Sequence, residues 1–246
     1  MHQESIKTVA AVRYRDGAVE QIEDQIIVED TFNLYLNGTK YLSLVASRDS
    51  LEELGAGFFI AAGIAKRIRD VKTEGQDIFV TAEEVTNKNS SLESAGGIDT
   101  GIPEVSVSCG VTVTPEEIFA IRASLNSEVW DKTGGLHCTA LYHKGKVAGL
   151  FSDIGRHNTV DKAVGFMVLH NFDPSECIIG CTGRQPKGMV AKAANAGIPI
   201  VISRAAATTA GIETAEKTGV TLVCFTRDRR FTVYTHPERI SGIVYP

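Results

Sequence analysis

Short apolar runs alternate with longer amphipathic segments in the second half of the chain. Helical periodicity is expected from about Asn158, from near Pro186 and through TAGIETAEK at 209–217. Gly197 and Gly219 stand where two of these helices should end. The alternation predicts an α/β fold, with a largely parallel sheet and helices packed on it. The expected strands are KVAGLF at 146–151, CIIGC at 177–181, IPIVIS at 198–203, VTLVCF at 220–225 and FTVYT at 231–235.

The first half of the chain is dominated by β-branched and aromatic runs around one helical segment. Asn37-Gly38 predicts a hairpin turn, and residues 47–68 have helical periodicity with acids in the first turn. Strands are expected at TVAAVRY (8–14), DQIIVED (24–30), FNLYL (32–36), KYLSLVA (40–46) and DIFVTAEEV (77–85).

A polar, glycine-bearing stretch at 86–101 separates these two regions. We therefore divide the chain near residue 104, into an N-terminal β-rich subdomain at 1–104 and an α/β core at 105–246. Thr114 and Glu117 form a capping box around Pro115, which predicts a helix through EEIFAIRASLNSEV.

Composition narrows the class of protein. The chain has 246 residues, 43% of them hydrophobic, and a net charge of −5. An acidic chain of this kind argues against a general nucleic-acid binder. The N-terminus lacks the pattern of a signal peptide, and the most apolar run, LGAGFFIAAGIA at 54–65, is too short to span a bilayer. We expect a cytoplasmic protein without a membrane or nucleic-acid partner.

Arginines follow the ends of the predicted strands. In open α/β sheets, ligands bind outside the carboxyl ends of the strands. A cationic sheet edge would suit an anionic ligand such as a pyrophosphate, which guanidinium groups bind in a bidentate manner. The alternative is ordinary charge on exposed loops. No Walker A or GxGxxG motif accompanies these loops. The arginines are Arg156, Arg184, Arg204, Arg227, Arg229 and Arg230.

A charged cluster lies within FSDIGRHNTVDKAVG at 151–165. Asn158 and Asp161 resemble a helix-capping pair. The preceding residues Asp153, Arg156 and His157 are not needed by that cap and are interpreted as ligand-binding. Asp153 would act as a general base or as an acceptor that orients a ligand, and the alternative is an ion pair between Asp153 and Arg156.

Five cysteines without a CxxC pair disfavour a disulfide framework. Cys177, Cys181 and Cys224 lie in apolar strands and are expected to be core residues. Cys109 lies between Ser108 and Gly110 before a helix start. It is the candidate nucleophile, and the alternative is a spare thiol.

His137, Cys138 and His143 raise the question of a metal site. A deaminase-type zinc site needs an HxE pair and a PCxxC segment, and the chain has no PCxxC segment. We expect no intrinsic zinc. His137 is retained as a candidate for positioning a substrate.

Several motifs in order along the chain resemble the FdhD family of formate dehydrogenase accessory sulfurtransferases. They are DSLEELGAGFFIAAGI, SCGV, GGLHCTAL, DIGRHNTVDKAVG, TGR, AGIPIVISRAAATT and FTRDRRFTVYTHPERI. The resemblance implies a three-layer core similar to cytidine deaminases, with a mixed, largely parallel sheet and without the zinc chemistry. It also implies an N-terminal extension and a homodimer.

The resemblance further implies a persulfide on Cys109, received from a cysteine desulfurase. The sulfur would pass to the molybdenum or tungsten bis(molybdopterin guanine dinucleotide) cofactor of formate dehydrogenase. The cofactor segment of the family maps onto Phe225, Thr226, Arg227, Asp228, Arg229 and Arg230. Asp153, Arg156, His157, Thr182, Gly183, Arg184 and Arg204 would complete the cradle.

Two alternatives accompany this hypothesis. Many family members have a second cysteine three residues after the first, where this chain has Thr112. A relay between two thiols is thereby excluded, which favours a non-enzymatic carrier or chaperone of the same cofactor. The other alternative is a nucleotide-processing enzyme of deaminase-like fold, which the missing PCxxC segment disfavours.

Overall fold

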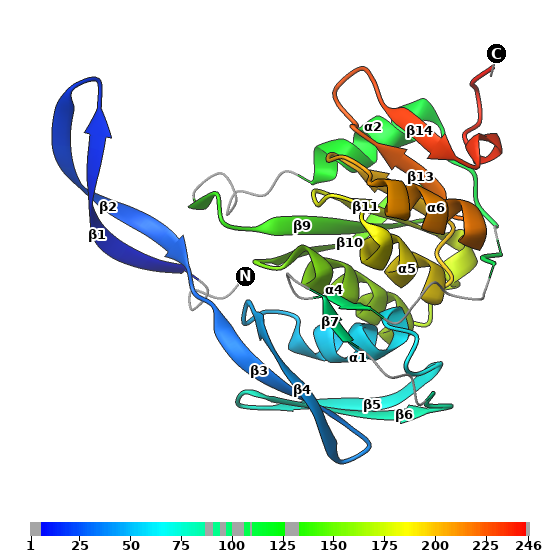
Figure 1. Cartoon of the computed structure of the whole chain (residues 1–246), viewed down its shortest axis with the longest axis horizontal. Helices are drawn as coiled ribbons and strands as arrows, with labels where there is room; N and C mark the ends of the chain where they lie inside the picture. Colours follow the sequence, from blue (N-terminus) through cyan, green and yellow to red (C-terminus); the bar gives the residue numbers. More distant parts are fainter. Residues whose placement is uncertain are drawn as a thin grey trace.

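A six-stranded sheet forms the centre of the molecule (Figure 1). The computed structural model describes residues 6–86, 91–93, 97–99, 106–108, 110–125 and 133–244. The strands of the central sheet follow the order β10-β9-β11-β12-β13-β14. Their bounds are β9 His137–His143, β10 Lys146–Asp153, β11 Cys177–Cys181, β12 Ile200–Ser203, β13 Thr221–Cys224 and β14 Thr232–Thr235.

The sheet is mixed, and its parallel part is smaller than the sequence pattern predicted. Only β11, β12 and β13 pair in parallel, whereas β14 pairs antiparallel with β13. Strand β9, which the sequence reading did not assign, lies between β10 and β11 and is antiparallel to both. A turn at Lys144 and Gly145, both with positive φ (48° and 78°), joins β9 to β10. The hairpin replaces a parallel crossover at this edge.

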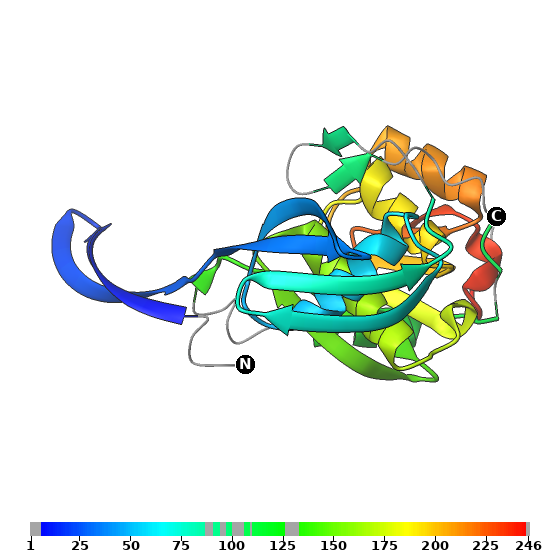
Figure 2. The same ribbon diagram turned by 90° about the horizontal axis from the view of Figure 1, so that it is seen from below.

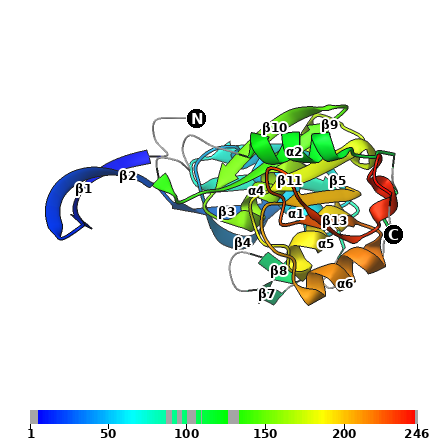
Figure 3. The ribbon, with the colours of Figure 1, turned by 90° about the horizontal axis from the view of Figure 1, so that it is seen from above.

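Helices cover both faces of this sheet (Figure 3). One face carries α2 (Pro115–Ser124), whose Ile118 and Ile121 pack with Ile178 and Val223. Thr114 and Glu117 form the predicted capping box of α2. The opposite face carries α4 (Arg156–Leu169), α5 (Lys187–Asn195) and α6 (Thr209–Thr218). Short 3-10 turns occupy Pro174–Glu176 and Pro237–Arg239.

A second sheet forms an outer layer, with α1 (Leu51–Ala61) between it and α4 (Figures 1 and 2). The order of its strands is β4-β3-β6-β5. Asn37 and Gly38 have φ of 50° and 83°, as the predicted hairpin turn between β3 and β4 requires. The bounds are β3 Asp30–Leu36, β4 Thr39–Ala46, β5 Arg67–Glu74 and β6 Asp77–Glu83, with a separate hairpin of β7 Ser91–Glu93 and β8 Gly97–Asp99.

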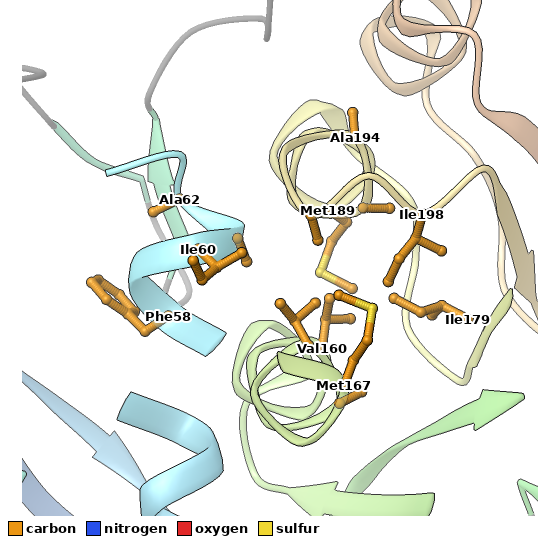
Figure 4. Close-up of a cluster of buried hydrophobic side chains, with 14 of the residues drawn as sticks. Phe58, Ile60, Ala62, Val160, Met167, Ile179, Met189, Ala194 and Ile198 are labelled. Atoms are coloured by element: carbon orange, nitrogen blue, oxygen red, sulfur yellow. The ribbon is translucent and has the colours of Figure 1, made fainter. Parts of the chain in front are cut away.

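Helices α1 and α4 cross with their backbones in contact. A Cβ on Gly57 would lie 1.7 Å from the carbonyl oxygen of Asp161, and one on Gly165 would lie 1.9 Å from that of Glu53. Only glycine permits this approach. Figure 4 shows buried apolar side chains of α1, α4, α5 and β11 that belong to the same core. The hydrophobic core therefore continues across the division expected near residue 104.

The apolar run at 54–65 lies inside this core. Helix α1 has 11 residues and is buried from Leu54 to Ala61. Within the described part of the chain, no helix has both the length and the apolar character needed to cross a membrane.

A long hairpin of β1 (Ile6–Arg15) and β2 (Ala18–Ile27) projects from the body of the protein (Figures 1 and 2). We call residues 6–27 the arm. Val12, Tyr14 and Val19 near its tip are 68%, 73% and 69% exposed. At its root, Ile27 packs close to Gly135, just before β9.

Candidate anion-binding site

The strand directions bring the predicted ligand loops to one edge of the central sheet. Cys181 of β11 is paired with Ser203 of β12, and Asp153 of β10 with His137 of β9. The carboxyl ends of β10, β11, β12 and β13 therefore share this edge, which we call the arginine edge. Its loops are joined by backbone hydrogen bonds: the amide of Arg204 donates to Cys181 (3.0 Å), and that of Thr226 donates to Ser203 (3.1 Å).

The guanidinium groups at the arginine edge influence one another. Burial and the nearby charge of Arg184 lower the pKa of Arg156. Burial lowers the pKa of Arg204, and so do the charges of Arg122 and Arg227. Like charges held this close repel each other, and a bound anion would relieve that repulsion.

The loop that follows β13 is anchored at both ends. The amide of Phe225, a residue with φ of 51°, donates to the carbonyl of Ala205 (3.0 Å), and the amide of Arg227 donates to that of Arg230 (2.8 Å). Arg227 Nη1 also donates to the carbonyl oxygens of Thr226 and Arg204. Arg227, Asp228, Arg229 and Arg230 are exposed, so the loop presents three cations and one acid to solvent.

Buried polar atoms without a hydrogen-bond partner gather at this edge. Native proteins leave few such atoms, and each one calls for an explanation. All four found in the described residues belong to the edge loops or to helix ends beside them: Arg122 Nε, Arg156 Nε, His157 Nδ1 and Thr226 Oγ1. Two are guanidinium donors, and Thr226 offers a hydroxyl. The set fits an anionic ligand with several acceptor oxygens.

Two helix N-termini at the arginine edge also lack side-chain caps. Helices α4 and α5 begin after Gly155 and Pro186 without a capping hydrogen bond, whereas α2 and α6 are capped by Thr114 and Thr208. Uncapped backbone amides at a helix N-terminus favour an anion.

The prediction that Asn158 and Asp161 cap a helix is wrong. Helix α4 begins at Arg156, ahead of both residues. The side-chain amide of Asn158 donates from Nδ2 to the carbonyl of Val45 and to Oδ1 of Asp153, each at 2.9 Å. Asp161 is buried and accepts two hydrogen bonds from Lys192, at 2.5 and 2.7 Å. Both side chains point into the protein, where they bond with residues distant in the sequence.

Asp153 does not face a ligand, contrary to the sequence interpretation, and Arg156 is not its partner. Its carboxylate is fully buried, and its Oδ2 lies 2.7 Å from Nζ of Lys162. Ser47 donates to the same oxygen from its amide (3.1 Å) and its hydroxyl (3.0 Å). The other oxygen accepts from the amide of Gly155 (3.0 Å) and from Asn158. Both oxygens are thus hydrogen-bonded within the protein, and Asp153 fixes the loop that precedes α4.

His157 is buried in the first turn of α4. Burial, Lys192 and Arg156 together lower its pKa to about 3, so the imidazole is neutral. A neutral ring with an unpartnered Nδ1 can donate or accept one hydrogen bond without adding charge.

Thr182 and Gly183 shape the loop after β11. The Thr182 hydroxyl lies 3.2 Å from His137 Nδ1 and accepts from the amide of Cys138 at 3.0 Å. A Cβ on Gly183 would lie 2.9 Å from that of Arg156, so glycine lets Arg156 lie against this loop. His137 therefore borders the site, whereas His143, at the far end of β9, bonds with Glu176.

Residues 27–241 of the chain match the FdhD/NarQ family. The chain belongs to this family. It is 33% identical to the sulfur carrier protein FdhD of Bacillus licheniformis, over 93% of this chain and 95% of that protein. It is also 33% identical to the sulfur carrier protein FdhD of Wolinella succinogenes, over 96% and 90%. A crystal structure from Desulfotalea psychrophila, named as a formate dehydrogenase accessory protein, superposes with a TM-score of 0.83 at 27% identity, covering 96% of this chain and 99% of that chain.

Four of the five cysteines of this FdhD/NarQ family member are buried and unsuited to carry sulfur. Burial raises the pKa of Cys177 to about 12, that of Cys181 to about 11, and those of Cys138 and Cys224 above their ordinary value. A buried, protonated thiol is a poor nucleophile. The predictions for Cys177, Cys181 and Cys224 as core residues are confirmed.

Cys109, the candidate nucleophile, lies outside the described residues. Its described neighbours are fixed at the end of the sheet opposite to the arginine edge. The amide of Val107 donates to the carbonyl of Thr218, just before β13, and the amide of Gly110 donates to that of Ser175, just before β11. The 5 residues of β11 span roughly 16 Å. Val107 and Gly110 therefore lie at the end of the central sheet opposite to the arginine edge.

Proposed function

We propose that this FdhD/NarQ family member serves formate dehydrogenase as a sulfur carrier. It would take persulfide sulfur from a cysteine desulfurase and deliver it to the enzyme's molybdenum or tungsten bis(molybdopterin guanine dinucleotide) cofactor. The names of its relatives support this role. The proposal includes a cytidine deaminase-like core, a homodimer and a cytoplasmic location.

One observation carries the binding half of the proposal: the unpartnered buried donors lie among the arginines of one sheet edge. A guanine dinucleotide carries pyrophosphates, whose oxygens suit guanidinium forks. Arg156, Arg184 and Arg204 would hold phosphates, together with His157, Thr182, Gly183 and residues 225–230. When bound, the cofactor supplies the metal that accepts sulfur, while these residues position it and neutralise its charge.

Cys109 would carry the sulfur. Its thiolate would attack the terminal sulfur of the desulfurase persulfide, so that one S–S bond forms as the donor's S–S bond breaks and the donor cysteine leaves as a thiolate. No further oxidant is needed. The burial of the other four cysteines supports this choice.

Intact-mass measurement tests the loading step. The protein is incubated with cysteine and a cysteine desulfurase, and the expected product carries the mass of one additional sulfur atom. Cys109→Ser should abolish the addition, and the matched variant Cys138→Ser should retain it. Equal loading of the Cys109→Ser variant would overturn the assignment, as would no loading of the unmodified protein when a family member with CxxC loads normally.

Calorimetry with guanosine diphosphate tests the binding half. The double substitution Arg156→Gln and Arg184→Gln should weaken binding at least about tenfold, since each charged hydrogen bond lost costs ~1.5–3 kcal/mol. Arg69→Gln, on the outer sheet, should bind as the unmodified protein does. Unchanged binding in the double variant would remove the arginine edge from the proposal.

A cofactor carrier without sulfur chemistry is the second candidate, and Thr112 in place of a second cysteine favours it. Cys109→Ala separates the two. The sulfur-carrier proposal expects maturation of formate dehydrogenase to collapse in cells carrying this variant, whereas unchanged maturation would support the simple carrier.

A further inference from the structure

We propose that Arg122, Arg204 and Arg227 form a phosphate subsite that the carboxylate of Asp228 occupies until an anionic ligand displaces it. The inference rests on the proposed function, because it assumes that a phosphate-bearing ligand reaches the arginine edge. It adds Arg122 to the site, a residue on α2 that no sequence motif indicated, and gives Asp228 the role of an internal competitor.

The geometry begins with an ion pair between two distant segments. Nη1 of Arg122, in the last turn of α2, lies 2.5 Å from Oδ1 of Asp228 in the loop after β13. The rings of Phe119 and Phe231, 5.7 Å apart, hold α2 against the end of that loop. The contact therefore joins two fixed elements.

The two partners of this pair differ in how they are held. The side chain of Arg122 is 20% exposed, whereas that of Asp228 is 81% exposed. Nε of Arg122 is buried and has no hydrogen-bond partner, so Asp228 satisfies only part of the guanidinium. The arginine belongs to the protein surface, and the aspartate is the member that can turn away into solvent.

Two further arginines, Arg204 and Arg227, lie near this ion pair. The nearby charges of Arg122 and Arg227 lower the pKa of Arg204, while Asp228 acts in the opposite direction. Arg227 is fixed by hydrogen bonds from its Nη1 to the carbonyl oxygens of Arg204 and Thr226. Asp228 brings one negative charge to this group of arginines, fewer than a phosphate would supply.

Exchange of Asp228 for a phosphate is favourable for two reasons. An ion pair with a largely exposed carboxylate contributes little stability, so breaking it costs little. A phosphate brings more charge and can meet a guanidinium through two oxygens. If Asp228 stayed in place, it would repel the incoming phosphate, which makes the aspartate a built-in brake on binding.

Inorganic pyrophosphate, titrated by calorimetry at low ionic strength, is the probe. Asp228→Asn removes the competing charge and is expected to tighten binding about tenfold, because like-charge juxtaposition is costly. Arg122→Gln is expected to weaken binding about tenfold. In the double variant, the gain from Asp228→Asn should be largely lost, since Arg122 is the group that the aspartate blocks.

The arm offers a matched control pair. Arg13 and Glu20 form an exposed ion pair there, with 4.0 Å between Nη1 and Oε1. Glu20→Gln and Arg13→Gln change the net charge by the same amounts as the two test substitutions. Neither should change the affinity for pyrophosphate, so a general charge effect is separated from a local one.

The possible results distinguish the two proposals. Weaker or equal binding by Asp228→Asn, with normal binding by the unmodified protein, would overturn the displacement and leave the arginine edge intact. Absence of pyrophosphate binding in every variant would overturn both the subsite and the proposed cofactor site. Far-UV circular dichroism of each variant confirms that the fold is retained.

Discussion

Nζ of Lys162 lies 2.7 Å from Oδ2 of Asp153, and both side chains are entirely buried. Removing one partner of a buried ion pair leaves an uncompensated charge and costs about 3–5 kcal/mol. Lys162→Met should therefore lower the free energy of unfolding by that amount, measured by urea denaturation at neutral pH. A loss below about 1 kcal/mol would show that Asp153 does not depend on this lysine.

Lys144→Met serves as the control for that measurement. Lys144 lies 3.2 Å from Glu176, but its side chain is 66% exposed. Exposed ion pairs contribute only ~0–1 kcal/mol, so the same substitution should change little here. The contrast isolates the effect of burial.

His157 predicts a pH dependence of stability. Its pKa falls from 6.5 in the unfolded chain to about 3 in the fold, mainly through burial. Between these values the unfolded chain binds a proton that the folded protein does not. The contribution of His157 to the free energy of unfolding is therefore complete above the unfolded pKa and is lost as the pH falls toward 3. About 2 kcal/mol should disappear between the unfolded pKa and about pH 5.

The comparison of the unmodified protein with His157→Gln measures this effect. Asp161 acts in the opposite direction, because burial raises its pKa to about 6 and the folded protein then binds the extra proton. The pH dependence due to Asp161 is common to both proteins and cancels when their free energies of unfolding are subtracted. Parallel stability profiles for the two proteins would mean that His157 titrates normally.

The crossing of α1 and α4 predicts a large effect from a single methyl group. A Cβ on Gly57 would lie 1.7 Å from a backbone oxygen of α4, so the helices must separate. Gly57→Ala should destabilise the protein by about 3 kcal/mol or more, although alanine favours a helix by ~1 kcal/mol. Gly135→Ala, whose Cβ would find its nearest atom at 3.5 Å, is the control. Equal melting temperatures of the two variants would contradict the crossing.

The arm should contribute little to the stability of the body. Most of its side chains are exposed, and an isolated two-stranded hairpin is only marginally stable. Replacing residues 8–25 with a short turn should change the melting temperature by less than about 4 °C, as expected for up to ~1 kcal/mol in a domain of this size. A larger decrease in calorimetry would reveal that the arm packs on the body or on another chain.

Local features of this fold could be predicted from the sequence, whereas long-range ones could not. The capping box joins Thr114 and Glu117, which are three positions apart, so both of its hydrogen bonds can be predicted from the local sequence. Asn158 looks like a cap for the same reason, yet its side-chain amide donates to the carbonyl of Val45, 113 residues away. Propensity for a cap yields where a buried partner is available.

The same distinction applies to the site. The arginine loops could be predicted because each follows an apolar strand directly. Arg122 lies on a helix of the opposite layer, and only the fold brings it to Asp228. Strand β9 was missed because its residues were considered for metal chemistry. The Lys144-Gly145 turn between β9 and β10 was the signal that could have revealed the hairpin.

Gly57 of α1 and Gly165 of α4 hold together two parts of the chain that could be produced as separate polypeptides. The contact consists of backbone and does not depend on large side chains, and the two helices lie on opposite sides of residues 87–105. Two polypeptides separated between residues 87 and 105 would be expected to associate on mixing. This family member would then serve as a split protein: each half could be fused to a different protein, and reassembly would report that the two fused proteins are close together.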